Sequence, residues 1–259
     1  MFSVRQIKKQ AKELLSKNII LHIGVITALF TCVTAISLLS ASVLTLINGL
    51  VSVAVFYTMQ AFFICFGMVM TVPIIYGFCV FECNAVDSQE LDIKDLFCAF
   101  SSLDVFNRSY FLAFALLWRV GVCFFPAIFF YLEIMLYRIS KSSFFIPVSL
   151  FGFDITYTFM CVLLMFFIIT GLAVFSRFFT AIYISVTNED IPVSKCFSLA
   201  SVYNHGYKKK LLIITASFVP LIVLSLITMG ILFVLYAAPL MLTTYFNFAK
   251  NCYDFGKNQ

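Results

Sequence analysis

The chain has 259 residues, of which 63% are hydrophobic and 11% charged, and its mean hydropathy is +1.05. A soluble domain has about 45–50% apolar and about 25% charged residues, so this composition excludes a water-soluble globular fold. The net charge of +5 fits the lysine and arginine that membrane proteins carry on their cytoplasmic side. No soluble segment interleaves basic and aromatic residues as nucleic-acid binding requires. We therefore predict an integral membrane protein that binds no nucleic acid.

Residues 1–17 predict a basic amphipathic helix. The apolar residues at helical spacing on one face are Val4, Ile7, Ala11, Leu14 and Leu15. The basic residues on the rest of the helix are Arg5, Lys8, Lys9 and Lys12. Such a helix is expected to lie in the interface of an anionic leaflet. The alternative is the start of a signal peptide, but the apolar run Ile19–Ile47 is longer than the usual apolar segment of about 7–15 residues.

The rest of the chain predicts six membrane spans, because each needs about 20 apolar residues. They lie at about 19–46, 51–81, 110–136, 155–185, 211–229 and 231–249, in one transmembrane domain covering residues 1–259. Asn48–Gly49 forms a turn between the first two spans. Gly230 divides the last apolar run into a tight hairpin whose arms contain Pro220 and Pro239; the alternative is one long kinked helix. The predicted fold is an all-α, polytopic membrane helix bundle.

Loop charges set the orientation of this bundle. With the N-terminus inside, the basic residues of the cytoplasmic segments are Arg5, Lys8, Lys9, Lys12, Lys17, Lys94, Arg108, Lys195, Lys208, Lys209, Lys210, Lys250 and Lys257. The outer loops contain Arg138 and Lys141. Because lysine and arginine favour the cytoplasmic side, we predict a multi-pass protein of the inner (plasma) membrane with both termini in the cytoplasm.

Two cytoplasmic segments resemble each other at a spacing of one hundred residues. "ELDIKDLFCAFSSLDVFNRSYFLAF" (90–114) aligns without a gap to "DIPVSKCFSLASVYNHGYKKKLLII" (190–214), which pairs Phe97 with Phe197 and Arg108 with Lys208. The sequence identity is low, so the duplication is a weak internal repeat. Both segments predict a short interfacial helix that rests on the membrane with an aromatic residue facing inward.

The opening "VRQIKKQAKELLSKNIILHIGV" resembles the start of a bacterial family of integral membrane proteins that carry a domain of unknown function. "RFFTAIYISVTNEDIPVSKCFSLASVYNHGYKKKLLIITASFVPL" and "YAAPLMLTTYFNFAKNCYD" are similar to the second half and the ending of that family. This chain departs from the pattern in its order His205–Gly206 and in its many phenylalanines. The resemblance implies a six-helix multi-pass fold with no established reaction, distantly similar to the membrane-domain portion of glycerophosphodiester phosphodiesterases.

Arg119 is the sharpest candidate for a functional residue, because it lies about nine residues into the third span, where a charge is costly. It is expected either to bind a lipid headgroup or another anion, or to be a structural arginine that bonds to carbonyls or extends toward the interface. His205, Lys208, Lys209 and Lys210 are candidates for binding phosphate or a phospholipid headgroup. Charges around the outer loop, including Glu133 and Asp154, predict a solvated rim, with an ion-binding gate as the alternative.

Catalytic chemistry is not predicted. The sequence has no G-x-S-x-G, H-E-x-x-H or comparable constellation. Its nine cysteines mostly lie in apolar runs and do not form a zinc-binding set. We expect no catalytic residue, no metal and no cofactor.

The expected function is therefore that of a non-enzymatic bacterial inner-membrane protein that supports the envelope or binds a partner. Its expected partners are anionic membrane lipids, together with a protein or a second copy of the chain. The alternative is a transporter of a small solute or peptide, or an immunity-type membrane protein. A transporter needs a polar cavity at mid-membrane, and Arg119 and the first-span residues Thr27, Thr31 and Thr34 are the candidates to line it.

Overall fold

The computed structural model describes residues 3–47, 52–140, 149–150, 153–228, 230 and 232–257. The elements are α1 (Val4–Ile47), α2 (Val53–Val86), η1 (Ile93–Phe100), α3 (Leu103–Ser140), β1 (Ser149–Leu150), β2 (Phe153–Asp154), α4 (Ile155–Phe175), α5 (Phe178–Thr187), α6 (Val193–Tyr203), α7 (Lys208–Ala216), α8 (Val219–Ile227), η2 (Phe233–Ala237) and α9 (Ala238–Lys257). The two short strands pair antiparallel, with Ser149 opposite Asp154. The described part is thus almost entirely helical, as predicted.

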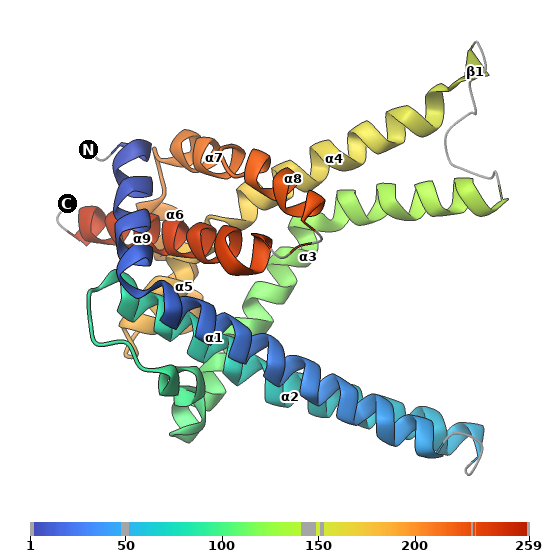
Figure 1. The fold of residues 1–259 in the computed structure, drawn as a ribbon, viewed down its shortest axis with the longest axis horizontal. Helices are drawn as coiled ribbons and strands as arrows, with labels where there is room; N and C mark the ends of the chain where they lie inside the picture. Colours follow the sequence, from blue (N-terminus) through green and yellow to red (C-terminus); the bar gives the residue numbers. More distant parts are fainter. Residues whose placement is uncertain are drawn as a thin grey trace.

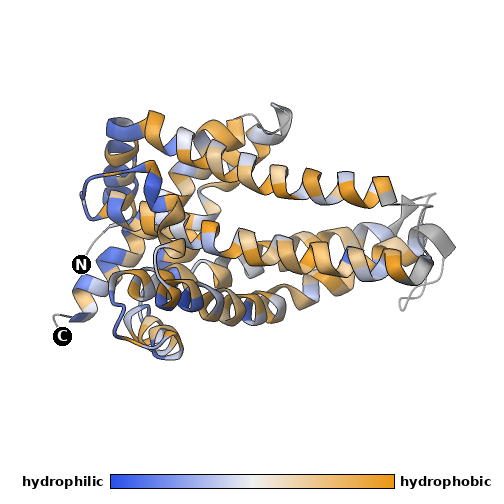
Figure 2. Ribbon diagram, turned by 90° about the horizontal axis from the view of Figure 1, so that it is seen from below, coloured by the Kyte–Doolittle hydropathy of each residue, from blue (hydrophilic) through white to orange (hydrophobic). Residues whose placement is uncertain are grey.

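Two long helical pairs project from one compact end of the molecule. α1 packs along α2, and α3 along α4 (Figure 1). By length and composition, three helices among the described residues can cross a membrane: Val4–Leu46, Val55–Val86 and Leu103–Tyr137. Figure 2 shows apolar residues along the projecting helices and hydrophilic ones gathered at the end that holds both termini. This fits a membrane bundle, while the six spans remain a prediction.

The second half of the bundle is more broken than predicted. The expected fourth span, 155–185, is interrupted at Ser176–Arg177 between α4 and α5, where the side-chain amide of Asn204 donates to the carbonyl of Arg177. The expected fifth span is interrupted between α7 and α8. Because side-chain bonds and short turns satisfy the freed backbone groups, a helix can break here without leaving them unpaired.

The chain reverses direction between α8 and α9, at the position predicted for the hairpin, while the two spans of that hairpin remain a prediction. α8 ends at Ile227 and α9 runs back toward the compact end (Figure 1). Gly230 adopts φ +82°, a left-handed conformation that glycine reaches without strain. Pro220 lies in the first turn of α8, where the missing N–H costs no helical hydrogen bond. Pro239 closely follows the π-helical turn η2, and such a local change of helix type satisfies the backbone groups that a proline frees. The turn at Asn48–Gly49 lies outside the described residues.

The N-terminal amphipathic helix forms, and its apolar face is buried within the protein. It is the first part of α1, and non-helical angles at Asn18 (φ −129°, ψ 27°) separate it from the span. Its apolar face, with Ile7, Ala11 and Leu15 at most 2% exposed, is covered by the chain itself. The Asn247 side chain of α9 donates to the Ile7 carbonyl. The apolar face of this helix therefore packs against α9, and its position at the membrane interface remains a prediction.

The short helices of the two loops are likewise packed against the bundle. Phe197 of α6 is buried, as predicted for an inward-facing aromatic residue. Its counterpart in η1, Phe97, is 47% exposed, and Leu96 is the buried side chain there. The two short helices therefore differ in the residue that packs on the bundle, and their contact with the membrane remains a prediction.

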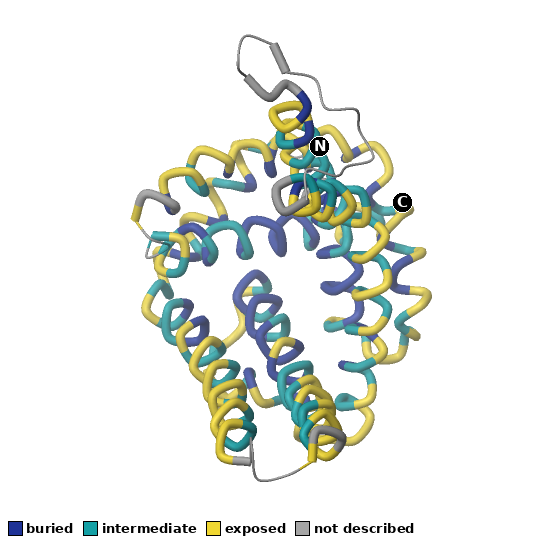
Figure 3. Tube along the Cα trace, turned by 90° about the vertical axis from the view of Figure 1, so that its right-hand side faces the viewer, coloured by how far each residue is buried: buried dark blue, intermediate teal, exposed yellow. Residues whose placement is uncertain are grey.

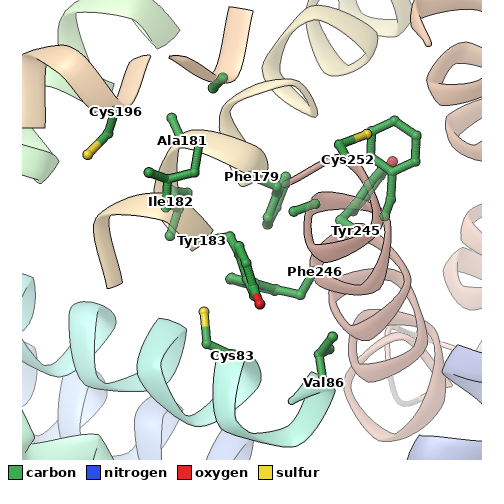
Figure 4. Close-up of a cluster of buried hydrophobic side chains, with 14 of the residues drawn as sticks. Cys83, Val86, Phe179, Ala181, Ile182, Tyr183, Cys196, Tyr245, Phe246 and Cys252 are labelled. Atoms are coloured by element: carbon green, nitrogen blue, oxygen red, sulfur yellow. The ribbon is translucent and has the colours of Figure 1, made fainter. Parts of the chain in front are cut away.

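The main core lies around α5. In Figure 4, Ala181, Ile182 and Tyr183 lie between α2, which contributes Cys83 and Val86, and α9, on which Tyr245, Phe246 and Cys252 lie. The ring of Phe179 stacks on that of Tyr245, with centroids 4.9 Å apart. Figure 3 shows the buried residues toward the middle of the molecule and the exposed ones on the outer helices. The core thus anchors the compact end, which carries the polar residues.

Candidate functional site

The compact end, which we call the polar end, is formed by residues 3–18, 84–110, 185–210 and 247–257. Lys208, Lys209 and His205 are exposed on it, at the turn from α6 into α7. Lys210 is half-buried, and its Nζ lies 5.2 Å from the centre of the Tyr207 ring. We call Lys208–Lys210 the basic knot. The sequence placed these residues correctly on a surface.

The basic knot occupies an unfavourable position on its own helix. Lys208, Lys209 and Lys210 are the first three residues of α7, and its first turn contains no acidic residue. The helix dipole makes an N-terminus positive, so each lysine there costs about 0.3–1 kcal/mol. The three charges therefore do not stabilise α7, and a negatively charged binding partner would compensate for their cost.

Arg119 lies in the bundle and contacts α6. Its guanidinium stacks over the ring of Phe197, 3.9 Å from the centroid. Its Nη1 donates to the carbonyl of Ala115, four residues earlier, over 2.9 Å. Within the part of the chain that the structure describes, Nε and Nη2 bond to no protein atom. Arg119 lies on α3 and contacts α6, whereas the basic knot lies at the start of α7. The predicted candidates therefore form two separate sites.

Two hollows meet on α3 beside Arg119. The first, about 690 Å³, is lined by Asp104, Asn107, Arg108, Phe111, Phe114, Ala115, Arg119, Pro192, Val193 and Ser194. The second, about 640 Å³, is lined by Phe114, Leu117, Trp118, Gly121, Val122, Phe125 and Ile128. Phe114 lines both, so a hollow that contains charged and polar residues against the start of α6 adjoins an apolar one along α3. We call the two hollows together the α3 groove.

Arg108 also lines this groove, but its guanidinium is hydrogen-bonded to backbone carbonyls of the protein. Its Nε donates to the carbonyl of Ser185 over 3.0 Å. Its Nη1 and Nη2 donate to the carbonyls of Glu189, Asn188 and Ile191, at 2.6–2.8 Å. These carbonyls lie at the end of α5 and in the loop after it, where backbone acceptors lack helical partners. Arg108 is thus a structural clamp, a role that sequence reasoning did not assign to it.

A second basic residue caps α2 in a similar way. Lys250 of α9 donates to the carbonyl of Val86 over 3.1 Å and forms an ion pair of 2.9 Å with Asp87. The hydroxyl of Tyr183 donates to the same carboxylate over 2.8 Å. Cations near helix C-termini are favourable, so this cluster fixes the ends of α2, α5 and α9 together.

The sequence analysis did not predict one fully buried polar cluster. His22 of α1, Glu82 of α2 and Thr243 of α9 are at most 1% exposed. Nδ1 of His22 lies 3.0 Å from one oxygen of Glu82, and the Thr243 hydroxyl donates to the other over 3.2 Å. His22 Nε2 is buried without a hydrogen-bond partner in the described residues. The three residues are far apart in the chain, so no local motif could have indicated the cluster.

The cysteine thiols of the polar end are not activated nucleophiles. Burial is the main cause that raises the pKa of Cys98 to about 11 and of Cys252 to about 12. Burial also raises the pKa of the Cys196 thiol. These thiols are therefore protonated at neutral pH and weakly reactive. No group of three metal-ligating side chains forms among the described residues. Of the predicted outer rim, the side chains of Arg138, Lys141 and Asp154 lie outside the described residues.

The fold and these sites define a class: an α-helical protein whose described part has three helices able to cross a membrane and gathers its polar groups at one end. The chain belongs to a specific family, because a family described as "Protein of unknown function (DUF975)" matches residues 1–254. This confirms the predicted resemblance to a family with a domain of unknown function. The similarity to phosphodiesterase membrane domains stays a prediction. No curated protein and no solved structure matches the chain.

Proposed function

We propose that this protein is a non-enzymatic, multi-pass protein of the bacterial inner membrane whose polar end faces the cytoplasm and binds anionic phospholipid. One observation carries the proposal: the exposed basic knot lies at the polar end, at the helix terminus where its charge is least favourable to the fold. An anionic leaflet attracts such a cluster with about 1 kcal/mol per basic residue. The absence of a lowered thiol pKa at the polar end supports a binding role over a catalytic one.

A transporter finds less support in the described residues. Its candidate lining in the first span, Thr27, Thr31 and Thr34, is exposed on the outside of α1. The hydroxyls of Thr31 and Thr34 donate to carbonyls three or four residues earlier in the same helix. This is the usual way for a helix to satisfy such groups in an apolar environment, and it requires no polar cavity.

The proposal is tested by extracting the protein with its surrounding lipid in polymer-bounded nanodiscs and measuring the ratio of anionic to zwitterionic phospholipid. Replacing Lys208, Lys209 and Lys210 with glutamine is expected to lower the enrichment of anionic lipid. Three charges at about 1 kcal/mol each correspond to a loss of affinity on the order of a hundredfold. The control replaces the same lysines with arginine, which retains the charge and should retain the enrichment. An unchanged ratio in the glutamine variant, at normal membrane levels, would refute the proposal.

A further inference from the structure

We infer that the α3 groove is a binding site for one phospholipid molecule, whose phosphate lies at Arg119 and whose acyl chains lie along α3 toward Ile128. This inference deepens the proposed function, because it adds a defined site to the surface attraction of the basic knot. It commits to a membrane phospholipid because the two hollows differ in chemistry as the two ends of that molecule do.

Arg119 provides the charge at the phosphate end. Its guanidinium is fixed by the stack on Phe197 and by the single bond to the Ala115 carbonyl. Nε and Nη2 remain as donors without a partner in the described chain, and a planar guanidinium matches a phosphate with two parallel hydrogen bonds. Arg119 is half-buried, so its unused donors can reach an anionic group from outside the chain.

The start of α6 adds a second set of donors to the same hollow. Pro192 is the N-cap of α6 and supplies no side-chain acceptor. The backbone N–H groups of Val193 and Ser194, both in the lining, are at the first turn, where a helix leaves its donors unpaired. A phosphate is favourable at such a terminus. Asp104 also lines this hollow, but it is fifteen residues from Arg119, about 22 Å by helical rise, and does not oppose a phosphate there.

The apolar hollow fits acyl chains. Phe114, Leu117 and Trp118 are 71–76% exposed in it, so no other part of the described chain covers them. Phe114 to Ile128 is about 21 Å by helical rise, compared with about 15 Å for half of a 30 Å hydrocarbon layer. A lipid chain can therefore lie along the groove for the full depth of a leaflet.

Trp118 makes the site measurable, because it is the one tryptophan of the chain. The purified protein in detergent micelles is titrated with phosphatidylglycerol whose acyl chains carry bromine, which quenches tryptophan fluorescence on contact. We expect quenching that saturates at about one lipid per protein. Diacylglycerol with the same brominated chains lacks the phosphate and should bind about tenfold more weakly, the loss expected for a charge-assisted hydrogen bond.

Two pairs of variants separate the two ends of the site. Arg119→Gln should weaken phosphatidylglycerol about tenfold and remove its advantage over diacylglycerol, whereas Arg119→Lys, which keeps the charge but not the planar fork, should keep part of that advantage. Gly121→Phe should weaken both lipids, because a side chain there meets no atom within 4 Å and extends into the apolar hollow. Gly24→Phe on α1, where the added side chain also meets no atom within 4 Å, is the matched control and should leave both titrations unchanged.

Two results would overturn the inference. One is equal quenching by phosphatidylglycerol and diacylglycerol in the unmodified protein. The other is a titration that Arg119→Gln and Gly121→Phe leave unchanged, as expected if the groove instead packs against a helix of another protein. The glutamine variants of the basic knot should retain the saturable quenching. A failure of the lipid site in the groove can therefore be distinguished from a failure of the proposed lipid binding by the basic knot.

Discussion

At the scale of single residues, some charged side chains in this protein bond with all their donor nitrogens to other protein groups, and others keep donor nitrogens that bond to no described protein group. Arg108 donates to four carbonyls, while Arg119 donates to one. Sequence reasoning singled out Arg119 by its depth in an apolar run, which is a local signal. It did not assign the clamp to Arg108, because the carbonyls that Arg108 holds come from a loop about 80 residues later.

Arg108→Gln is expected to destabilise the polar end, because it leaves the carbonyls at the end of α5 without their charged donor. Hydrogen bonds to charged groups contribute about 1.5–3 kcal/mol, so a loss of at least about 2 kcal/mol is expected. Arg108→Lys should restore only part of it, because an ammonium group lacks the planar fork. Thermal unfolding in detergent measures this. Equal melting temperatures for all three proteins would show that the clamp contributes nothing.

The buried cluster gives a second residue-scale prediction. Glu82→Ala removes the partner of both His22 and Thr243 and should cost about 2–5 kcal/mol, because it leaves two buried polar side chains without a hydrogen-bond partner. Thr243→Val removes only one neutral bond and should cost about 1 kcal/mol. The same unfolding measurement compares the two. If Thr243→Val proved as costly as Glu82→Ala, the carboxylate would not be the centre of the cluster.

At the scale of elements, the sequence predicted helices and their apolar faces better than it predicted what covers those faces. The spacing of Ile7, Ala11 and Leu15, each four residues from the next, correctly gave one apolar helix face. It could not tell protein from lipid as the partner, because both are equally apolar. Breaks such as Ser176–Arg177 were missed for a related reason: the amide that satisfies the break, on Asn204, lies outside the span.

Gly77 offers a test of how η1 packs on α2. A Cβ at this position would lie 2.1 Å from the backbone carbonyl oxygen of Leu96, so Gly77→Ala must push η1 away and is expected to cost at least about 2 kcal/mol. The control is Gly67→Ala on the same helix, whose Cβ would meet its nearest atom at 3.8 Å. That change should be neutral or stabilise by up to about 1 kcal/mol through helix propensity. If the two variants melted alike, the close contact between α2 and η1 would be wrong.

At the scale of the whole molecule, the polar end brings together the segments that carry thirteen of the basic residues counted from the sequence, although they are scattered from Arg5 to Lys257. Charge counting could predict that they share one side of a membrane, because the rule depends on loop composition alone. It could not predict the α3 groove, which depends on how α6 packs beside α3. The orientation of the polar end is the central claim, because both lipid sites depend on it.

Reporter fusions in bacterial cells test that orientation most directly. A fluorescent protein that folds only in the cytoplasm and an alkaline phosphatase that is active only outside it are each fused after residue 259 and after residue 145. The account predicts fluorescence and no phosphatase activity at residue 259, and the reverse at residue 145, with the protein retained in membranes after alkaline washing. Phosphatase activity at residue 259, or release of the protein by the wash, would contradict it.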